Sequence, residues 1–205
     1  IFHTTNHDDI LFQTTGRSTG LFANVDKTLR KGFEGSISGE IQRFNWMLSY
    51  SNINASFEDS FNALSPNHDF ADDDDEIQVR SGDKIPGIPE HQFKFLGNYE
   101  LTDGLHVGFD IARNSSQFLR GDESNQMGEI DGYTVANLRL RYAISENLEI
   151  FATVQNLFDR EFETFGLLGE EPNELEVPII EDLEIPIFLG SAPPRAGYIG
   201  LSYSF

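Results

Sequence analysis

The last residues of the chain alternate strictly between two sets of side chains. Ile199, Leu201, Tyr203 and Phe205 fall on one side, and the smaller or more polar residues between them fall on the other. Because successive side chains of a β-strand point to opposite faces, this alternation predicts a strand. The pattern restricts the fold more than any other feature, since it recurs along the sequence and no segment between two repeats has a helical period.

The same period of two appears in seven further segments. In LRLRYAI, for example, Leu138, Leu140 and Tyr142 lie on one face, and the two arginines between them lie on the other. We predict eight strands over residues 1–13, 21–41, 44–57, 91–101, 105–117, 133–144, 148–158 and 195–205. The expected fold is therefore all-β.

The connections between these strands alternate in length. Residues 42–43, 102–104 and 145–147 are typical of tight hairpin turns. Long loops are expected over residues 58–90, 118–132 and 159–194, with one of middle length over 14–20. Short turns at one end and long loops at the other are typical of an antiparallel β-barrel in a bacterial outer membrane.

Charged residues occupy one face of the predicted strands, and this pattern alone leaves a soluble β-sandwich open as an alternative. The charged positions are Glu34, Glu40, Lys94, Glu100, Asp110, Arg139, Arg141 and Glu149. The length of the strands and a group of aromatic residues near the short turns favour the membrane barrel, where such residues form a band at the interface. These aromatic residues are Phe44, Trp46, Tyr99, Tyr142, Tyr203 and Phe205.

Composition excludes several classes of function. The net charge is −20, from 34 acidic and 14 basic residues, which argues against nucleic-acid binding. There is no cysteine, hence no disulfide or thiolate chemistry. No apolar run is long enough for a transmembrane helix, no signal peptide is evident, and no nucleophile or phosphate-loop motif indicates an enzyme. A first residue other than Met indicates a mature or clipped product, or a fragment.

Several segments together resemble one family, the TonB-dependent outer-membrane receptors. VQNLFDREFETFG at 154–166 resembles the penultimate-strand motif of the family, and NVDKTLRKGFEG at 24–35 resembles an earlier strand. The segments at 85–101, 115–126 and 132–144 follow in the family's order, and PPRAGYIGLSYSF resembles its closing strand. The resemblance extends over nearly the whole chain.

This resemblance implies a transmembrane antiparallel β-barrel of about 22 strands with a plug in its lumen. Residues 1–205 would form the C-terminal part of that barrel, about eight strands, without the plug. The implied location is the bacterial outer membrane, in contact with its lipid and lipopolysaccharide. The TonB–ExbB–ExbD system would act through the missing N-terminal part, and Leu201, Tyr203 and Phe205 resemble the signal read by the barrel assembly machinery.

The resemblance implies active transport of a scarce nutrient, a ferric siderophore before haem or a glycan, with no cofactor. Ligand contacts are expected in the long loops. Phe118 could stack, Arg120 could grip an anionic group, and Asn125 and Gln126 could form hydrogen bonds, with Arg80 as a further base. Arg120 could equally pair with Asp122 or Glu123. A free-standing eight-stranded barrel with a structural or adhesive role is the second reading, and an outer-membrane hydrolase the third.

Acidic residues dominate two of the long loops. The run Asp72, Asp73, Asp74 and Asp75 invites a calcium site, because hard cations take carboxylate oxygens. The run lacks the ligand spacing of a calcium-binding loop, so a solvated acidic loop is the simpler interpretation. His68, in the same loop, could bind haem iron or a divalent metal, although a single loop histidine is usually solvated.

Overall fold

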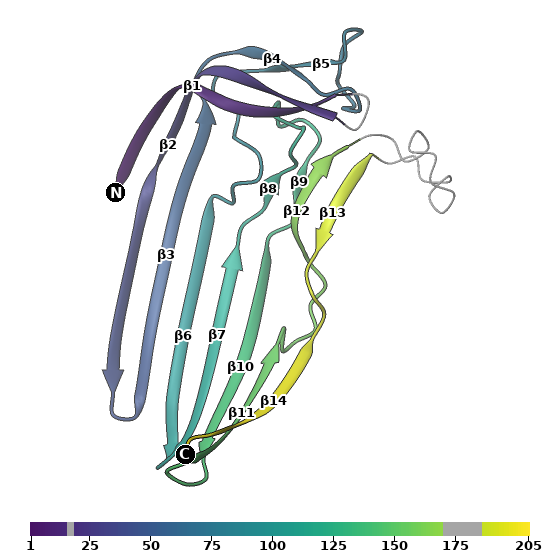
Figure 1. The fold of residues 1–205 in the computed structure, drawn as a ribbon. Coiled ribbons are helices and arrows are strands. Elements are labelled where there is room, and N and C mark those ends of the chain that lie inside the picture. Colours follow the sequence, from purple (N-terminus) through teal and green to yellow (C-terminus); the bar gives the residue numbers. More distant parts are fainter. Residues whose placement is uncertain (16–18, 170–185) are drawn as a thin grey trace, which may run out of the picture.

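The computed structural model describes residues 1–15, 19–169 and 186–205. Eight long strands form one antiparallel sheet, in the order β1-β2-β3-β6-β7-β10-β11-β14 (Figure 1). Their bounds are β1 Phe2–Thr15, β2 Thr19–Ile41, β3 Phe44–Phe57, β6 His91–Thr102, β7 Leu105–Asn114, β10 Tyr133–Ala143, β11 Leu148–Gln155 and β14 Ala196–Tyr203. All eight predicted strands are confirmed, with ends that differ by a few residues.

The tight turns and the long connections lie at opposite ends of the sheet (Figure 1). Ile41 pairs with Phe44 across a two-residue turn, and Gly104 adopts a φ of 87° in the Asp-Gly turn between β6 and β7. Gly tolerates that left-handed conformation without strain, which explains its place there. The C-terminus lies at the same end as these turns.

The long connections are not loops throughout, so this part of the sequence prediction was wrong. Each contains a two-stranded sheet, formed by β4 with β5, β8 with β9, and β12 with β13. Their bounds are β4 Phe61–Leu64, β5 Glu76–Val79, β8 Gln117–Phe118, β9 Glu129–Ile130, β12 Glu163–Leu168 and β13 Ile187–Ser191. Strands of two to six residues are too short to show a reliable period in the sequence.

The best-buried apolar cluster lies where the ends of β2 and β3 meet the first long connection. It contains Val25, Phe57, Ala63, Ile77 and Val79, none more than 2% exposed. The cluster joins the upper ends of β2 and β3 to the β4–β5 hairpin. Burial of these side chains explains why such short strands form, because an isolated two-stranded hairpin is at best marginally stable in water.

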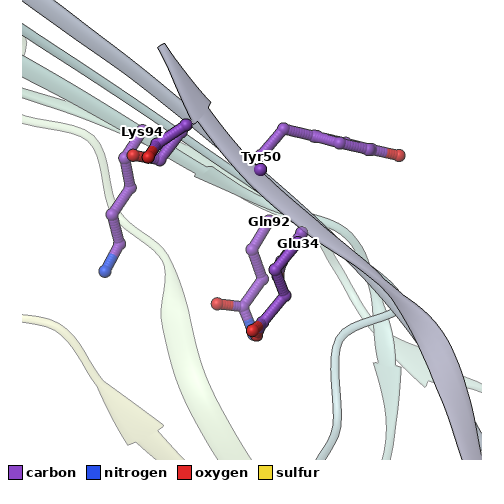
Figure 2. Close-up of a pocket in the computed structure, with 8 residues that line it drawn as sticks. Glu34, Tyr50, Gln92 and Lys94 are labelled. Atoms are coloured by element: carbon purple, nitrogen blue, oxygen red, sulfur yellow. The ribbon is translucent and has the colours of Figure 1, made fainter. Parts of the chain in front are cut away.

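The two faces of the long sheet differ in chemistry. One face, called here the outer face, carries Phe33 and Tyr50, whose rings are 5.3 Å apart. Figure 2 shows Glu34 and Gln92 directed to the opposite face, called here the inner face. Ion pairs on the inner face join Arg139 to Asp110 at 3.5 Å and Arg141 to Glu149 at 2.8 Å. In the described part of the chain no second sheet of comparable size covers the apolar outer face, as a soluble sandwich would require.

The sheet is open, because β1 and β14 are its two edges and do not pair with each other. The described residues therefore do not form the closed eight-stranded barrel of the second reading. They also contain no helix long and apolar enough to span a membrane. An open sheet edge in hydrocarbon leaves backbone N–H and C=O groups without partners, each at several kcal/mol.

We therefore expect further strands to close the wall in the membrane, and mass spectrometry of the outer-membrane protein checks this. The polypeptide that carries this sequence should have a mass several times 23.1 kDa. A native polypeptide of 23.1 kDa that crosses the membrane without a second chain would contradict the expectation.

Candidate ligand-binding site

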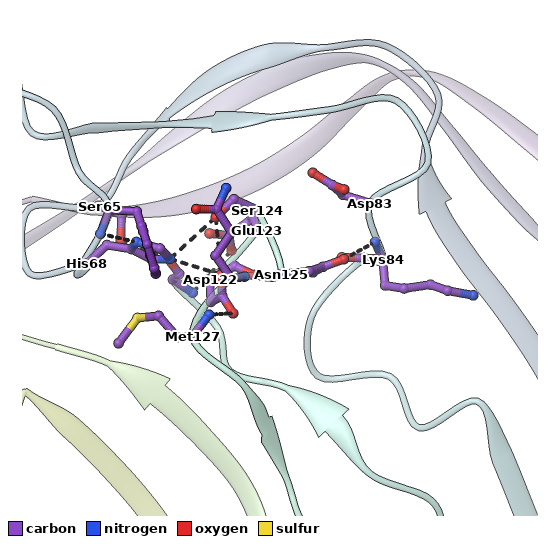
Figure 3. Close-up of polar contacts among 12 residues, drawn as sticks. Ser65, His68, Asp83, Lys84, Asp122, Glu123, Ser124, Asn125 and Met127 are labelled. Atoms are coloured by element: carbon purple, nitrogen blue, oxygen red, sulfur yellow. Dashed lines mark hydrogen bonds and ion pairs between the residues drawn. The ribbon is translucent and has the colours of Figure 1, made fainter.

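The three long connections meet in one assembly at the loop end of the sheet, called here the cap: residues 58–90, 115–132, 156–169 and 186–195, with the bend of β1 and β2 above them (Figure 1). Its middle is the stretch 119–127, called here the central segment. Figure 3 shows Ser65 and His68 facing Asp122, Glu123 and Ser124 of the central segment. The contacts between these residues decide what the cap can do.

A buried histidine joins the first loop to the central segment. The Nε2 atom of His68 lies 2.9 Å from an Asp122 carboxylate oxygen, and both side chains are completely buried. The Nδ1 atom of His68 accepts a hydrogen bond from the backbone N–H of Phe70 at 3.1 Å. Since Nδ1 is an acceptor, Nε2 carries the ring proton and donates a hydrogen bond to the Asp122 carboxylate. Both ring nitrogens are thus engaged, so neither is available for haem iron or another metal.

Ser124 also lies in this cluster, but the three residues do not form a catalytic triad. Its hydroxyl is 3.4 Å from Nε2 of His68 and donates to Asp122 at 3.2 Å. In a triad the serine and the carboxylate contact opposite ring nitrogens, whereas here both contact Nε2. The cluster therefore joins two loops and does not activate a nucleophile.

Further hydrogen bonds fix the central segment. The Asp122 carboxylate accepts the backbone N–H groups of Gln126 at 2.8 Å and Met127 at 3.0 Å. The Asn125 side chain accepts from the N–H of Lys84 and donates to its carbonyl oxygen. Each polar group of Asp122 and Asn125 is thus used within the cap, and the first loop is held at two separate points.

The third connection is held by the same segment. The N–H of Arg120 donates to the Gly166 carbonyl at 3.1 Å, and the N–H of Leu168 donates to the Arg120 carbonyl at 2.7 Å. Asn67 adds a side-chain bond to the Gly169 carbonyl at 2.7 Å. The central segment therefore connects all three loops into one body.

Arg120 lies at a cavity of about 340 Å³ between the β1–β2 bend and the three loops. The cavity is mainly apolar, and its lining includes Ile10, Phe12, Phe22, Ile85, Arg120, Glu123, Phe165 and Leu167. We call it the Arg120 cavity. The side chain of Arg120 is exposed and crosses Gly87, where an added Cβ would lie 3.3 Å from its Nε. Within the described residues it forms no ion pair with Asp122 or Glu123, the alternative that the sequence left open.

The other predicted contact residues are divided between different places. Phe118 and Asn125 line a separate cavity of about 290 Å³, together with Lys84 and Glu90. Gln126 is an exposed residue of the central segment, and Arg80 is exposed just after β5; neither lines one of these two cavities. The structure thus brings two of the five residues together and places Arg120 at a different cavity.

The acidic run forms an exposed turn before β5. One Asp72 carboxylate oxygen accepts the N–H groups of Asp74 and Glu76, each at 3.0 Å, which explains an aspartate at this point of the turn. In the parts of the chain that the structure describes, no three His, Cys, Asp or Glu side chains are grouped as a metal would need.

The predicted assembly signal lies at the end of β14. Leu201 and Tyr203 pair with Ile150 and Leu148 of β11, which places them on the outer face. The rings of Tyr203 and Phe205 are 5.6 Å apart.

Glu123 is the one group of the cap with a strongly perturbed pKa among the residues that the structure describes. Burial raises the pKa of this carboxyl from 4.5 to about 7, and the nearby Asp122 carboxylate raises it by a smaller amount. The hydrogen bond from the N–H of Gly121 acts in the opposite direction, because it favours the charged form. The folded pKa lies above the unfolded one. Glu123 therefore stabilises the closed cap below pH 4.5, and this contribution is lost as the pH rises to about 7.

We predict that Glu123→Gln removes this pH dependence. The shift corresponds to roughly 3 kcal/mol, so the wild-type cap should open more easily at pH 8 than at pH 4.5, and the variant should open about equally at both. Hydrogen exchange of the central segment, corrected for the intrinsic rate at each pH, measures the difference. A wild-type protein with no such dependence would contradict the assignment. Asp69→Asn, which changes an exposed acid of the first loop, is the control.

The inner face of the wall holds a shallow open pocket of about 460 Å³ below the cap. Glu34, Ser36, Ser49, Gln92 and Lys94 line it, and Figure 2 shows the carboxylate of Glu34 beside the amide of Gln92. Tyr50 comes from the same strand as Ser49 but points away to the outer face. The wall thus presents polar groups inward, as expected for the wet lumen of a large barrel.

Comparison with known proteins agrees with this architecture. The family model described as TonB dependent receptor-like, beta-barrel, matches residues 1–157. The catecholate siderophore receptor Fiu of Escherichia coli K12 is 26% identical over 158 residues, which cover 75% of this chain and 19% of Fiu. The metal-pseudopaline receptor CntO of Pseudomonas aeruginosa PAO1 is 31% identical over 86 residues, or 41% of this chain and 12% of CntO.

A solved structure has the same arrangement of strands. The ferric yersiniabactin uptake receptor FyuA from Yersinia pestis superposes with a TM-score of 0.69 at 17% identity, covering 99% of this chain and 26% of FyuA. The chain therefore spans about a quarter or less of the proteins it matches. The family match, the open antiparallel sheet and the two contrasting faces agree, and the chain belongs to the TonB-dependent receptor family as a section of an outer-membrane β-barrel wall.

Proposed function

We propose that the receptor containing this wall section imports a ferric siderophore across the outer membrane, with energy from the TonB–ExbB–ExbD system. The observation that carries the proposal is the Arg120 cavity, where the exposed residue Arg120 borders a mainly apolar lining with three phenylalanines. Ferric catecholate complexes combine negative charge with aromatic rings. A guanidinium binds such oxygens through two parallel hydrogen bonds, and the phenylalanines contact the rings.

The names of the relatives support the same class of ligand, since Fiu is a catecholate siderophore receptor and CntO receives a metal complex. Haem is less well supported, because His68 is buried with both ring nitrogens engaged. A glycan would favour a cavity lined by several polar side chains, whereas most of the lining here is apolar.

The test is uptake of radioactive iron by iron-starved cells whose only catecholate receptor is this one. The probe is the ferric complex of 2,3-dihydroxybenzoate, which is anionic, and a neutral ferric trihydroxamate is the comparison. We expect uptake of the catecholate that disappears when tonB is deleted. Equal uptake with and without the receptor, or preference for the neutral complex, would overturn the proposal.

The proposal includes the barrel assembly machinery as a partner, with Leu201, Tyr203 and Phe205 as the residues it reads. Deletion of Phe205 should lower the amount of folded receptor in the outer membrane, which its heat-dependent mobility on a denaturing gel measures. An unchanged amount would remove Phe205 from this role.

A further inference from the structure

Glu123 is a buried acid that borders the Arg120 cavity. It lines the cavity together with Arg120, and only 5% of its surface is exposed. Between the two residues, Gly121 adopts a φ of 97°, and a Cβ added there would lie 2.7 Å from the Cβ of Leu168. A glycine at this point lets the central segment turn sharply against the end of β12. Two residues that are close in the sequence can therefore both border one cavity.

The surroundings of Glu123 compensate little negative charge. Its carboxyl faces two backbone donors, the N–H of Gly121 at 3.2 Å and its own N–H. Within residues 1–15, 19–169 and 186–205, no base forms an ion pair with it. Asp122, which Figure 3 shows beside it, instead accepts from His68, Ser124 and two backbone N–H groups. Of these two adjacent carboxyls, only that of Asp122 has donors enough to match a charge.

Three charged or titratable residues face Glu123 in the part of the chain that the structure describes. Asp122 and His68 lie on the side of the cap and are bonded to each other at 2.9 Å. On the side of the cavity, Arg120 is the one other charged residue of a mainly apolar lining. Burial beside apolar groups disfavours a carboxylate, and the pKa of Glu123 is accordingly raised to about 7.

We propose that Glu123 is a ligand-contact residue, whose protonated carboxyl donates a hydrogen bond to an oxygen of the anionic complex in the Arg120 cavity. The inference rests on the function proposed above. An ionised carboxyl can only accept hydrogen bonds, as can the oxygens of the complex, and their like charges repel. When Glu123 is ionised, binding therefore takes up one proton from the solvent onto its carboxyl.

The direction of the pH dependence follows from this contact. With a pKa of about 7, Glu123 is mostly protonated at pH 6 and mostly ionised at pH 8. If only the protonated receptor accepts the complex, its affinity is about tenfold lower at pH 8 than at pH 6, because the competent fraction falls by that factor. The affinity is lost as the pH rises through about 7.

The test measures binding of the ferric 2,3-dihydroxybenzoate complex to the whole purified receptor at pH 6 and pH 8. Glutamine keeps a donor and carries no charge, so Glu123→Gln should lack the tenfold fall and bind at both pH values about as wild type does at pH 6. Asp69→Asn, an exposed acid of the first loop, is the control and should behave as wild type. The complex changes with pH in the same way for every protein, so the comparison between proteins isolates Glu123.

A third variant separates a ligand contact from a role in cap stability. Glu123→Ala also removes the buried charge, but it leaves no donor. We expect it to bind the complex at least about tenfold more weakly than Glu123→Gln at both pH values. Equal affinities of the alanine and glutamine variants would mean that Glu123 acts only through the stability of the cap, and would overturn the proposal.

The proton itself can be counted by calorimetry at pH 7.5 in two buffers that differ in ionisation enthalpy. Wild type should take up roughly 0.7 proton per bound complex more than Glu123→Gln. Equal uptake by the two proteins would overturn the role of Glu123 and leave the proposed ligand class intact. If the complex binds neither protein at either pH, the ligand class itself is wrong and this inference falls with it.

Discussion

The receptor with Arg120→Ala is expected to bind the ferric 2,3-dihydroxybenzoate complex roughly 10- to 100-fold more weakly than wild type. A hydrogen bond to a charged group contributes about 1.5–3 kcal/mol, and about 1.4 kcal/mol corresponds to a factor of ten. Arg120 is exposed at the cavity, and among the described residues its hydrogen bonds to the cap come from its backbone groups, so we expect that its side chain can be removed without loosening the loops.

Equilibrium binding to the purified receptor measures this effect. Arg120→Lys should restore part of the affinity, because lysine keeps the charge but not the planar pair of donors. Arg43→Ala, at the opposite end of the sheet and paired with Asp103, removes the same charge without touching the cap. A loss of affinity as large in Arg43→Ala as in Arg120→Ala would mean that the total charge matters and not the Arg120 contact.

Asp122→Ala is expected to open the cap. The substitution leaves four donors without an acceptor: Nε2 of His68, the Ser124 hydroxyl and the N–H groups of Gln126 and Met127. Removal of one partner from a buried pair of this kind destabilises by about 3–5 kcal/mol. Hydrogen exchange at residues 65–70 and 119–127 should become faster by at least about 100-fold, since about 1.4 kcal/mol is a factor of ten.

The barrel wall should not respond to this change, because β3, β6 and β7 are held by their own ladders. Asp69→Ala provides the matched control, since Asp69 is an exposed acid of the first loop, next to His68 in the sequence. Slow exchange at 119–127 in the Asp122→Ala protein would show that the hydrogen bonds of Asp122 do not hold the loops together.

The wall could be predicted from the sequence because each of its faces has a uniform environment along every strand. Phe33, Ile37 and Ile41 on one side of β2, and Glu34 and Glu40 on the other, report that environment directly. The short strands β4 and β5 could not be predicted in this way. They exist because Ala63, Ile77 and Val79 pack against Phe57 and Val25, and such contacts leave no period in the sequence.

The candidate site was predictable only in part. Arg120 was recognised as a base in a loop, and the structure places it at a cavity. The pairing of His68 with Asp122 joins residues 54 positions apart, which no local pattern reports. The burial of Glu123 likewise follows from the meeting of separate loops, since its neighbours in the sequence are polar and it lines one cavity together with Leu167 and Ile10.

The position of the iron atom tests the central claim most directly. Crystals of the whole receptor with bound ferric 2,3-dihydroxybenzoate, measured at the iron absorption edge, would locate it by anomalous scattering. We predict an anomalous peak beside the Arg120 cavity, close enough for a catecholate ring to contact Phe165 or Phe12 while its oxygens meet the Arg120 guanidinium. A fully occupied peak on the receptor with no part of the complex in that cavity would contradict the account.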